Sequence, residues 1–181
     1  MKKFGYTLAA VVLLVSFSQS KLFAQGVEKG DFLLSPGLGF GYLYAGGVTI
    51  GVTGEYAFTD EISGGGYVAF THWNNDFRYG TSSYSNNYNF IDFGVRASYH
   101  FAKLLQLPNM KFDPYAGAQV GFATSSYNYD GPSGSFNDAY DGSIRGGLYA
   151  GARYFVKDNI GFYGEVGFAL CPIMIGATFK F

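Results

Sequence analysis

The sequence predicts an all-β protein, an eight-stranded antiparallel up-and-down transmembrane β-barrel, and three observations carry this prediction. Eight segments alternate apolar side chains with small or polar ones at a period of two, as strands with a lipid face and a lumenal face do. The 181 residues include 20% aromatic residues and 27 glycines but only 14% charged residues, well below the roughly 25% of soluble domains. The two longest polar connections both follow odd-numbered segments, so they would lie on the same side of a membrane.

The amino-terminal residues predict a cleaved secretory signal. Lys2 and Lys3 precede the apolar run Leu8–Val15, and Ala24 provides the small residue that signal peptidase requires. The run is too short to span a bilayer. We therefore expect residues 1–24 to be a signal peptide and residues 25–181 to form one barrel domain. Cleavage removes three lysines and no acidic residue, so the exported chain is mildly acidic.

The first three strands are expected over residues 32–42, 48–58 and 62–70. In the first, Pro36 cannot donate a ladder hydrogen bond, which predicts an irregular start. Ala45-Gly46-Gly47 is expected to form the first turn. In the third, Gly64-Gly65-Gly66 predicts a bend or a bulge.

The next four strands are expected over residues 88–101, 112–124, 143–155 and 160–170. Each has an apolar outer face; that of the seventh strand consists of Ile160, Phe162, Val166, Phe168 and Leu170. The polar stretches 74–87 and 125–142 are expected to be loops. With both termini in the periplasm, both loops lie on the extracellular side.

The eighth strand, residues 173–181, combines the alternating pattern with an aromatic last residue. Gly176, Phe179 and Phe181 together resemble the sorting signal of bacterial outer-membrane β-barrels, which implies recognition by the outer-membrane assembly machinery. Two further stretches, Asp113-Pro114-Tyr115-Ala116-Gly117-Ala118 and Gly161-Phe162-Tyr163-Gly164-Glu165-Val166-Gly167-Phe168, are similar to recurring stretches of the small OmpA/OmpX-like outer-membrane β-barrel family. The resemblance implies an integral outer-membrane protein in contact with membrane lipid.

Charged side chains are expected in the lumen, which an eight-stranded barrel just fills with its own side chains. Buried charges must be paired, because isolated ones are costly. The cluster forms either a satisfied polar plug or the lining of a narrow ion path. Its predicted members are Glu55, Asp92, Arg96, Arg145, Arg153, Glu165 and Lys180.

The two loops suggest the function. They are rich in Tyr, Ser, Asn and Gly, a composition that suits adaptable recognition surfaces. A structural or surface-interaction role through residues 74–87 and 125–142 is therefore expected, with a surface ligand that the sequence does not identify. The alternatives are a lipid-modifying barrel enzyme, a small pore and a soluble ligand-binding barrel.

Catalytic and metal sites are not expected. His72, with Trp73 and Asp76 nearby, lies at the outer rim and His100 at the opposite end, and no serine motif accompanies either. The spacing of Asp130, Asp138 and Asp141 matches no calcium-binding loop. The single cysteine, Cys171, excludes an internal disulfide. We expect no enzyme activity, no cofactor, no nucleic-acid partner and a monomer.

Overall fold

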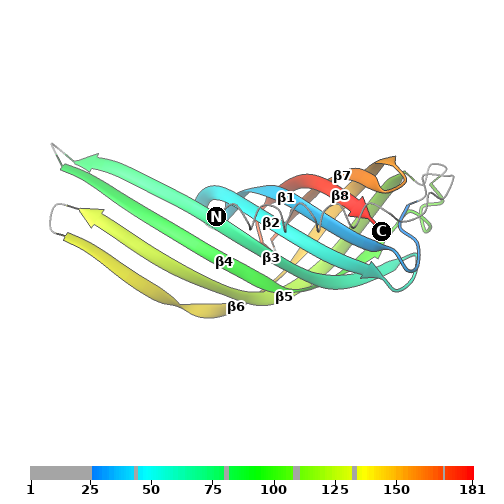
Figure 1. Ribbon diagram of the computed structural model, residues 1–181, viewed down its shortest axis with the longest axis horizontal. Coiled ribbons are helices and arrows are strands. Elements are labelled where there is room, and N and C mark those ends of the chain that lie inside the picture. Colours follow the sequence, from blue (N-terminus) through cyan, green and yellow to red (C-terminus); the bar gives the residue numbers. More distant parts are fainter. Residues whose placement is uncertain (1–25, 43–44, 80–81, 108–110, 132–133, 169) are drawn as a thin grey trace, which may run out of the picture.

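The computed structural model describes residues 26–42, 45–79, 82–107, 111–131, 134–168 and 170–181. Within residues 42–46, 74–88 and 125–141 it describes the backbone of the strands alone. The predicted signal peptide lies outside the described residues. The chain forms one closed barrel in which each strand pairs with its sequence neighbours and the last strand pairs with the first (Figure 1). The strands are β1 (Phe32–Tyr42), β2 (Ala45–Ala57), β3 (Ile62–Tyr79), β4 (Ser82–His100), β5 (Phe112–Gly131), β6 (Gly134–Lys157), β7 (Ile160–Gly167) and β8 (Ile173–Lys180).

Eight strands and antiparallel pairing at every junction confirm the predicted fold class. The alternation is regular: in β2, for example, Ile50 is 59% exposed while Thr49 and Glu55 are fully buried. The outer surface is consequently an apolar belt and the inner face carries the polar side chains, as a lipid-spanning wall requires. None of the described segments is a helix long and apolar enough to cross a membrane.

In their described parts, the stretches predicted to be long loops are strands, which corrects that prediction. The β3–β4 ladder continues to Tyr79↔Ser82, and the β5–β6 ladder continues to Gly131↔Gly134. Between them, β4 pairs with β5 out to Ser85↔Asp130. Figure 1 shows these four strands extending to the left, far beyond the ends of β1, β2, β7 and β8. Outside a membrane both faces of a sheet can meet water, so the apolar alternation that identifies a strand is lost while the pairing persists.

Two local predictions about the sheet, a bulge in the third strand and an outward-facing Leu170, are also wrong. No register shift occurs at Gly64-Gly65-Gly66, which pair continuously with β2 and β4. The glycines serve close approach instead, since a Cβ on Gly65 would lie 2.8 Å from Glu55 Cα. Leu170, expected on the lipid face, is buried in the lumen with Tyr163 and Met174, because β7 ends at Gly167 and the chain turns inward there.

Ala45-Gly46-Gly47 do not form the predicted turn, because β2 already begins at Ala45. Gly47 has a φ of 136°, a conformation that favours glycine, within that strand. The irregularity expected at Pro36 is present. The β1–β8 pairs pass from Leu34↔Phe179 directly to Gly37↔Gly176.

Candidate functional site in the barrel lumen

The centre of the lumen holds Arg96 of β4 between two carboxylates. Its Nε lies 2.6 Å from Oε1 of Glu55 on β2, and its Nη2 donates to Oε2 of Glu165 on β7 at 2.7 Å. The guanidinium carbon lies 3.9 Å from the centre of the Tyr149 ring, and Tyr115 donates a hydrogen bond to Glu165 at 3.1 Å. Arg96 therefore joins opposite walls of the barrel through paired charges.

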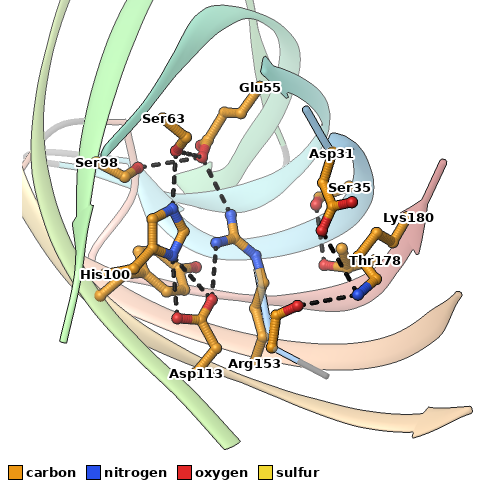
Figure 2. A network of polar contacts seen from close by, with 12 residues as sticks. Asp31, Ser35, Glu55, Ser63, Ser98, His100, Asp113, Arg153, Thr178 and Lys180 are labelled. Atoms are coloured by element: carbon orange, nitrogen blue, oxygen red, sulfur yellow. Dashed lines mark hydrogen bonds and ion pairs between the residues drawn. The ribbon is translucent and has the colours of Figure 1, made fainter. Parts of the chain in front are cut away.

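Arg153 of β6 makes a second pair of bridges, closer to the end of the barrel where Phe32 pairs with Phe181. Its Nη2 lies 3.3 Å from Glu55 Oε2 and its Nη1 lies 3.4 Å from Asp113 Oδ2 (Figure 2). The Tyr115 ring stacks under its guanidinium, with 4.0 Å between the guanidinium carbon and the ring centre. Glu55 thus contacts both arginines, and Ser63 and Ser98 also donate to its Oε2.

His100 connects this network to a serine and an aspartate. Its Nδ1 lies 2.9 Å from Asp113 Oδ2, and its Nε2 lies 2.9 Å from Ser63 Oγ (Figure 2). The order serine, histidine, aspartate matches that of a hydrolytic triad. However, Ser63 and Asp113 are fully buried and His100 is 1% exposed, and the Ser63 hydroxyl already donates to Glu55. A buried, hydrogen-bonded serine of this kind ties strands together and does not face a substrate.

Sequence reasoning missed Ser63, His100 and Asp113 as lumenal residues. Each lies at an inward position, where His100 follows Ser98 by two residues and Asp113 precedes Tyr115 by two. Extending the alternation to the strand ends would have found them. The contacts among them could not be read from spacing, because they join β3, β4 and β5.

The other predicted cluster members lie at other levels of the barrel. Lys180 donates to the carbonyl oxygen of Gly26 at 2.9 Å and lies 3.5 Å from Asp31, at the end of the barrel where Phe32 pairs with Phe181 (Figure 2). Asp92 is buried at an inward position of β4 and Arg145 is half-buried on β6, both toward the extended sheet. The structure therefore brings Glu55, Arg96, Arg153 and Glu165 together and leaves the remaining three at other levels of the barrel.

Apolar side chains close the network on both sides. Toward the end of the barrel where Phe32 pairs with Phe181, Val27 packs with Leu33, Ala57 and Phe155. Toward the extended sheet, the buried cluster comprises Tyr67, Ala69, Tyr163, Leu170, Cys171 and Met174. In the described interior, an apolar cluster therefore lies on each side of the charged network, and on the side of the extended sheet it is accompanied by the buried Asp92 and the hydrogen-bonded Thr49 and Thr71.

The residues considered for chemistry at the outer rim do not form a site in the described part of the chain. The His72 side chain is exposed, and its Nδ1 lies 2.8 Å from the side-chain oxygen of Asn89 on the paired strand. The side chains of Asp76, Asp130, Asp138 and Asp141 lie outside the described residues. At the opposite rim, a hydrogen bond from Lys103 lowers the pKa of the half-buried Glu61.

The carboxyl-terminal residues are tied into the wall. Phe181 exchanges two backbone hydrogen bonds with Phe32, at 3.0 and 2.9 Å. Phe179 pairs with Leu34 and Ile160, and Gly176 pairs with Gly37 and Tyr163. The role of these residues as an assembly signal stays a prediction.

Comparison with known proteins identifies the family. The model of the outer membrane protein beta-barrel domain family matches residues 7–171. The chain belongs to this family. It is therefore an integral outer-membrane β-barrel protein, as its alternating wall and closed topology also require. No curated protein matches the sequence.

Solved outer-membrane barrels share the fold. Ail, the attachment invasion locus protein of Yersinia pestis, matches with a TM-score of 0.57 at 13% identity, over 84% of this chain and 99% of Ail. OprG from Pseudomonas aeruginosa matches with a TM-score of 0.55 at 14% identity, over 87% of this chain and 98% of OprG. The barrel domain of OprF from the same organism gives 0.50 at 15% identity, over 84% and 98%. At these identities the likeness extends to the fold alone.

Proposed function

We propose that this outer-membrane barrel is a surface-interaction protein whose contact element is the sheet formed by β3, β4, β5 and β6 beyond the membrane. The observation that supports this proposal most strongly is the length of these four strands. The β2–β3 ladder ends at Val48↔His72, whereas β3 continues to Tyr79. The β6–β7 ladder ends at Tyr149↔Gly167, whereas β6 begins at Gly134. With the termini in the periplasm, this extension rises from the cell surface.

A sheet with two open edges can bind a partner by strand addition. The backbone N–H and C=O groups along such an edge pair with an extended segment of another protein. The β6 edge, from Gly134 up to the start of its pairing with β7, is the longer of the two in this barrel. Backbone pairing gives affinity, and the Tyr and Asn side chains of the sequence would contribute specificity.

Charge narrows the class of partner. Residues 125–142 contain Asp130, Asp138 and Asp141 and no basic residue, and residues 74–87 contain one Asp and one Arg. A solved structure of Ail contains the heparin analogue sucrose octasulfate, a polyanion. The acidic extension of this chain disfavours such a ligand, so a neutral or basic protein segment is the better candidate.

Shortening both hairpins tests the proposal. Because Trp73 pairs with Tyr88 and Ser125 pairs with Tyr140, residues 74–87 and 126–139 can each be replaced by Asn-Gly, a dipeptide that closes two-residue hairpins. We expect the shortened protein to remain in the outer membrane with normal heat-modifiable gel mobility. Cells that carry it should lose attachment to a panel of immobilised extracellular proteins to which cells with the full-length protein attach. Equal attachment of the two strains would refute the proposed role.

The lumen supports a structural role for the charged cluster in place of catalysis or conduction. Its ionised groups are paired across the barrel and enclosed by apolar layers. Such an arrangement fixes the barrel cross-section and offers no open path for ions. The enzyme and pore alternatives are supported by no contact among the described residues.

A further inference from the structure

A groove in the lipid-facing wall lies where the first and last strands meet. It has a volume of about 640 Å³, within the range of about 300–1,000 Å³ that is typical of small-molecule sites. Residues of β7, β8, β1 and β2 line it. It is separate from the charged lumen, since its entrance faces the membrane.

Small residues at the strand junction explain the groove. Pro36 and Ala177 are the outward residues at its floor, beside the paired glycines Gly37 and Gly176. Around them, larger apolar side chains project outward and are 47–60% exposed: Leu38, Ile50, Phe162 and Ile175. The floor lies deep because Pro36 and Ala177 have small side chains, and the walls stand out because they consist of branched and aromatic residues.

The groove also overlies an interruption in the sheet. The β1–β8 pairs pass from Leu34↔Phe179 to Gly37↔Gly176 without Pro36, which has no N–H to donate. On the lumenal side, the Ser35 and Thr178 hydroxyls form a hydrogen bond of 2.9 Å across the gap. A molecule in the groove would contact both strands at this interrupted position from the lipid side.

We propose that the groove binds one acyl chain of a phospholipid from the periplasmic leaflet. Its apolar lining is continuous with the lipid-facing belt of the barrel, so hydrocarbon is the chemistry that surrounds it. The β7 wall of the groove begins at Phe162, two residues after the strand starts at Ile160. Ile160 pairs with the exposed Lys157 at the rim of the barrel where Phe32 also pairs with Phe181. The Lys157 ammonium is thus placed to attract a lipid phosphate while the acyl chain reaches the groove.

Filling the groove tests this proposal. Ala177→Phe places a ring on the floor, and Ala118→Phe places the same ring on the lipid face of β5, outside the groove. Native mass spectrometry of the detergent-purified protein with added palmitoyl-oleoyl phosphatidylglycerol measures the fraction that carries one lipid. We expect one bound lipid for the wild type and for Ala118→Phe. Ala177→Phe should bind about tenfold more weakly, because about two methylene groups of the chain lose their contacts.

Heat-modifiable gel mobility shows whether Ala177→Phe assembles. If it does not, a second pair of variants tests the same proposal. Phe162→Ala removes a wall of the groove and should also weaken lipid binding, whereas Phe93→Ala removes an equally lipid-facing ring from β4 and should not. Lys157→Gln should weaken the binding of phosphatidylglycerol. Equal lipid binding by the groove variants and their controls would overturn the proposal. Preferential binding of lipid A would also overturn the proposal, because the groove would then hold a different lipid. A wild-type dimer that Ala177→Phe abolishes would overturn it too, because a second copy of the protein would then occupy the groove.

Discussion

Replacing Arg96 by Met tests whether the lumenal charges hold the barrel together. Met preserves most of the side-chain volume and removes the charge. Arg96 is only 5% exposed and is the cation nearest to Glu165, at 2.7 Å. Without it, Glu165 keeps the hydroxyl of Tyr115 as a described partner, while Glu55 keeps Arg153 and two serines. The variant therefore leaves one buried carboxylate without a cation.

The loss of one partner from a buried ion pair costs roughly 3–5 kcal/mol. This is a large share of the roughly 5–15 kcal/mol that stabilises a folded domain. With a urea dependence of about 1–3 kcal/mol per molar, the unfolding midpoint should fall by about 1 M or more. Urea unfolding in lipid vesicles, followed by the gel mobility of unheated samples, measures this change. The same substitution at Arg145, which is half-buried, should cost less because water reaches that side chain.

A double-mutant cycle separates the charge effect from lost packing. In the Arg96→Met background, Glu165→Gln removes the stranded carboxylate and should recover part of the lost stability. In the wild-type background, the same Glu165→Gln change should be destabilising, because it removes a partner of Arg96. Contacting residues of this kind show coupling of about 0.5–3 kcal/mol. Additive effects of the two changes, or an unchanged midpoint for Arg96→Met, would refute the conclusion that the pair stabilises the barrel.

Three further predictions follow from the wall and the interior. Gly151→Ala should cost about 1–3 kcal/mol because its Cβ would lie 2.6 Å from the Gly164 carbonyl oxygen and 2.8 Å from the Tyr115 ring; Gly164→Ala on the neighbouring strand, with nothing within 4 Å, is its control and should be neutral in urea unfolding. Deletion of Phe181 should reduce the amount of protein in outer membranes more than the amount exported, as measured by cell fractionation; equal losses would contradict an assembly role. In planar bilayers the wild-type protein should be silent because the described lumen is filled by paired charges and apolar layers; single-channel steps would contradict this.

The wall of the barrel was predictable because the membrane imposes a strict rule on it. Every lipid-facing side chain must be apolar, so residues such as Ile50 and Phe93 reveal both the strand and the face. The same alternation predicted which charges point inward, including Glu55, Arg96 and Arg153. It failed at Leu170, where the strand had already ended and alternation no longer described the direction of the side chain.

The partners of the lumenal charges were not predictable, because they depend on the barrel cross-section. Arg96 and Glu165 are far apart in the sequence and lie on strands that are not neighbours. Their contact requires the barrel to be narrow enough for two side chains to meet across it. The tyrosines show the same dependence: the ring of Tyr163 lies over Gly176, and that of Tyr115 lies over Gly151. Glycine on one strand makes room for tyrosine from the next, which explains why both residue types are abundant in this sequence.

The extended sheet shows why the functional surface was harder to recognise than the membrane wall. Between Trp73↔Tyr88 and Tyr79↔Ser82 the pairing is as regular as inside the membrane, yet the sequence of residues 74–87 is mostly polar and shows no apolar alternation. Composition alone therefore describes a loop. Strand pairing nevertheless joins β3, β4, β5 and β6 into a sheet with two edges, one on β3 and one on β6. The register fixes the positions of the backbone groups along these edges, which a loop would leave undefined. If the protein recognises partners at the cell surface, those edges determine the geometry of binding, and changes in hairpin length should alter recognition more than conservative changes of single side chains.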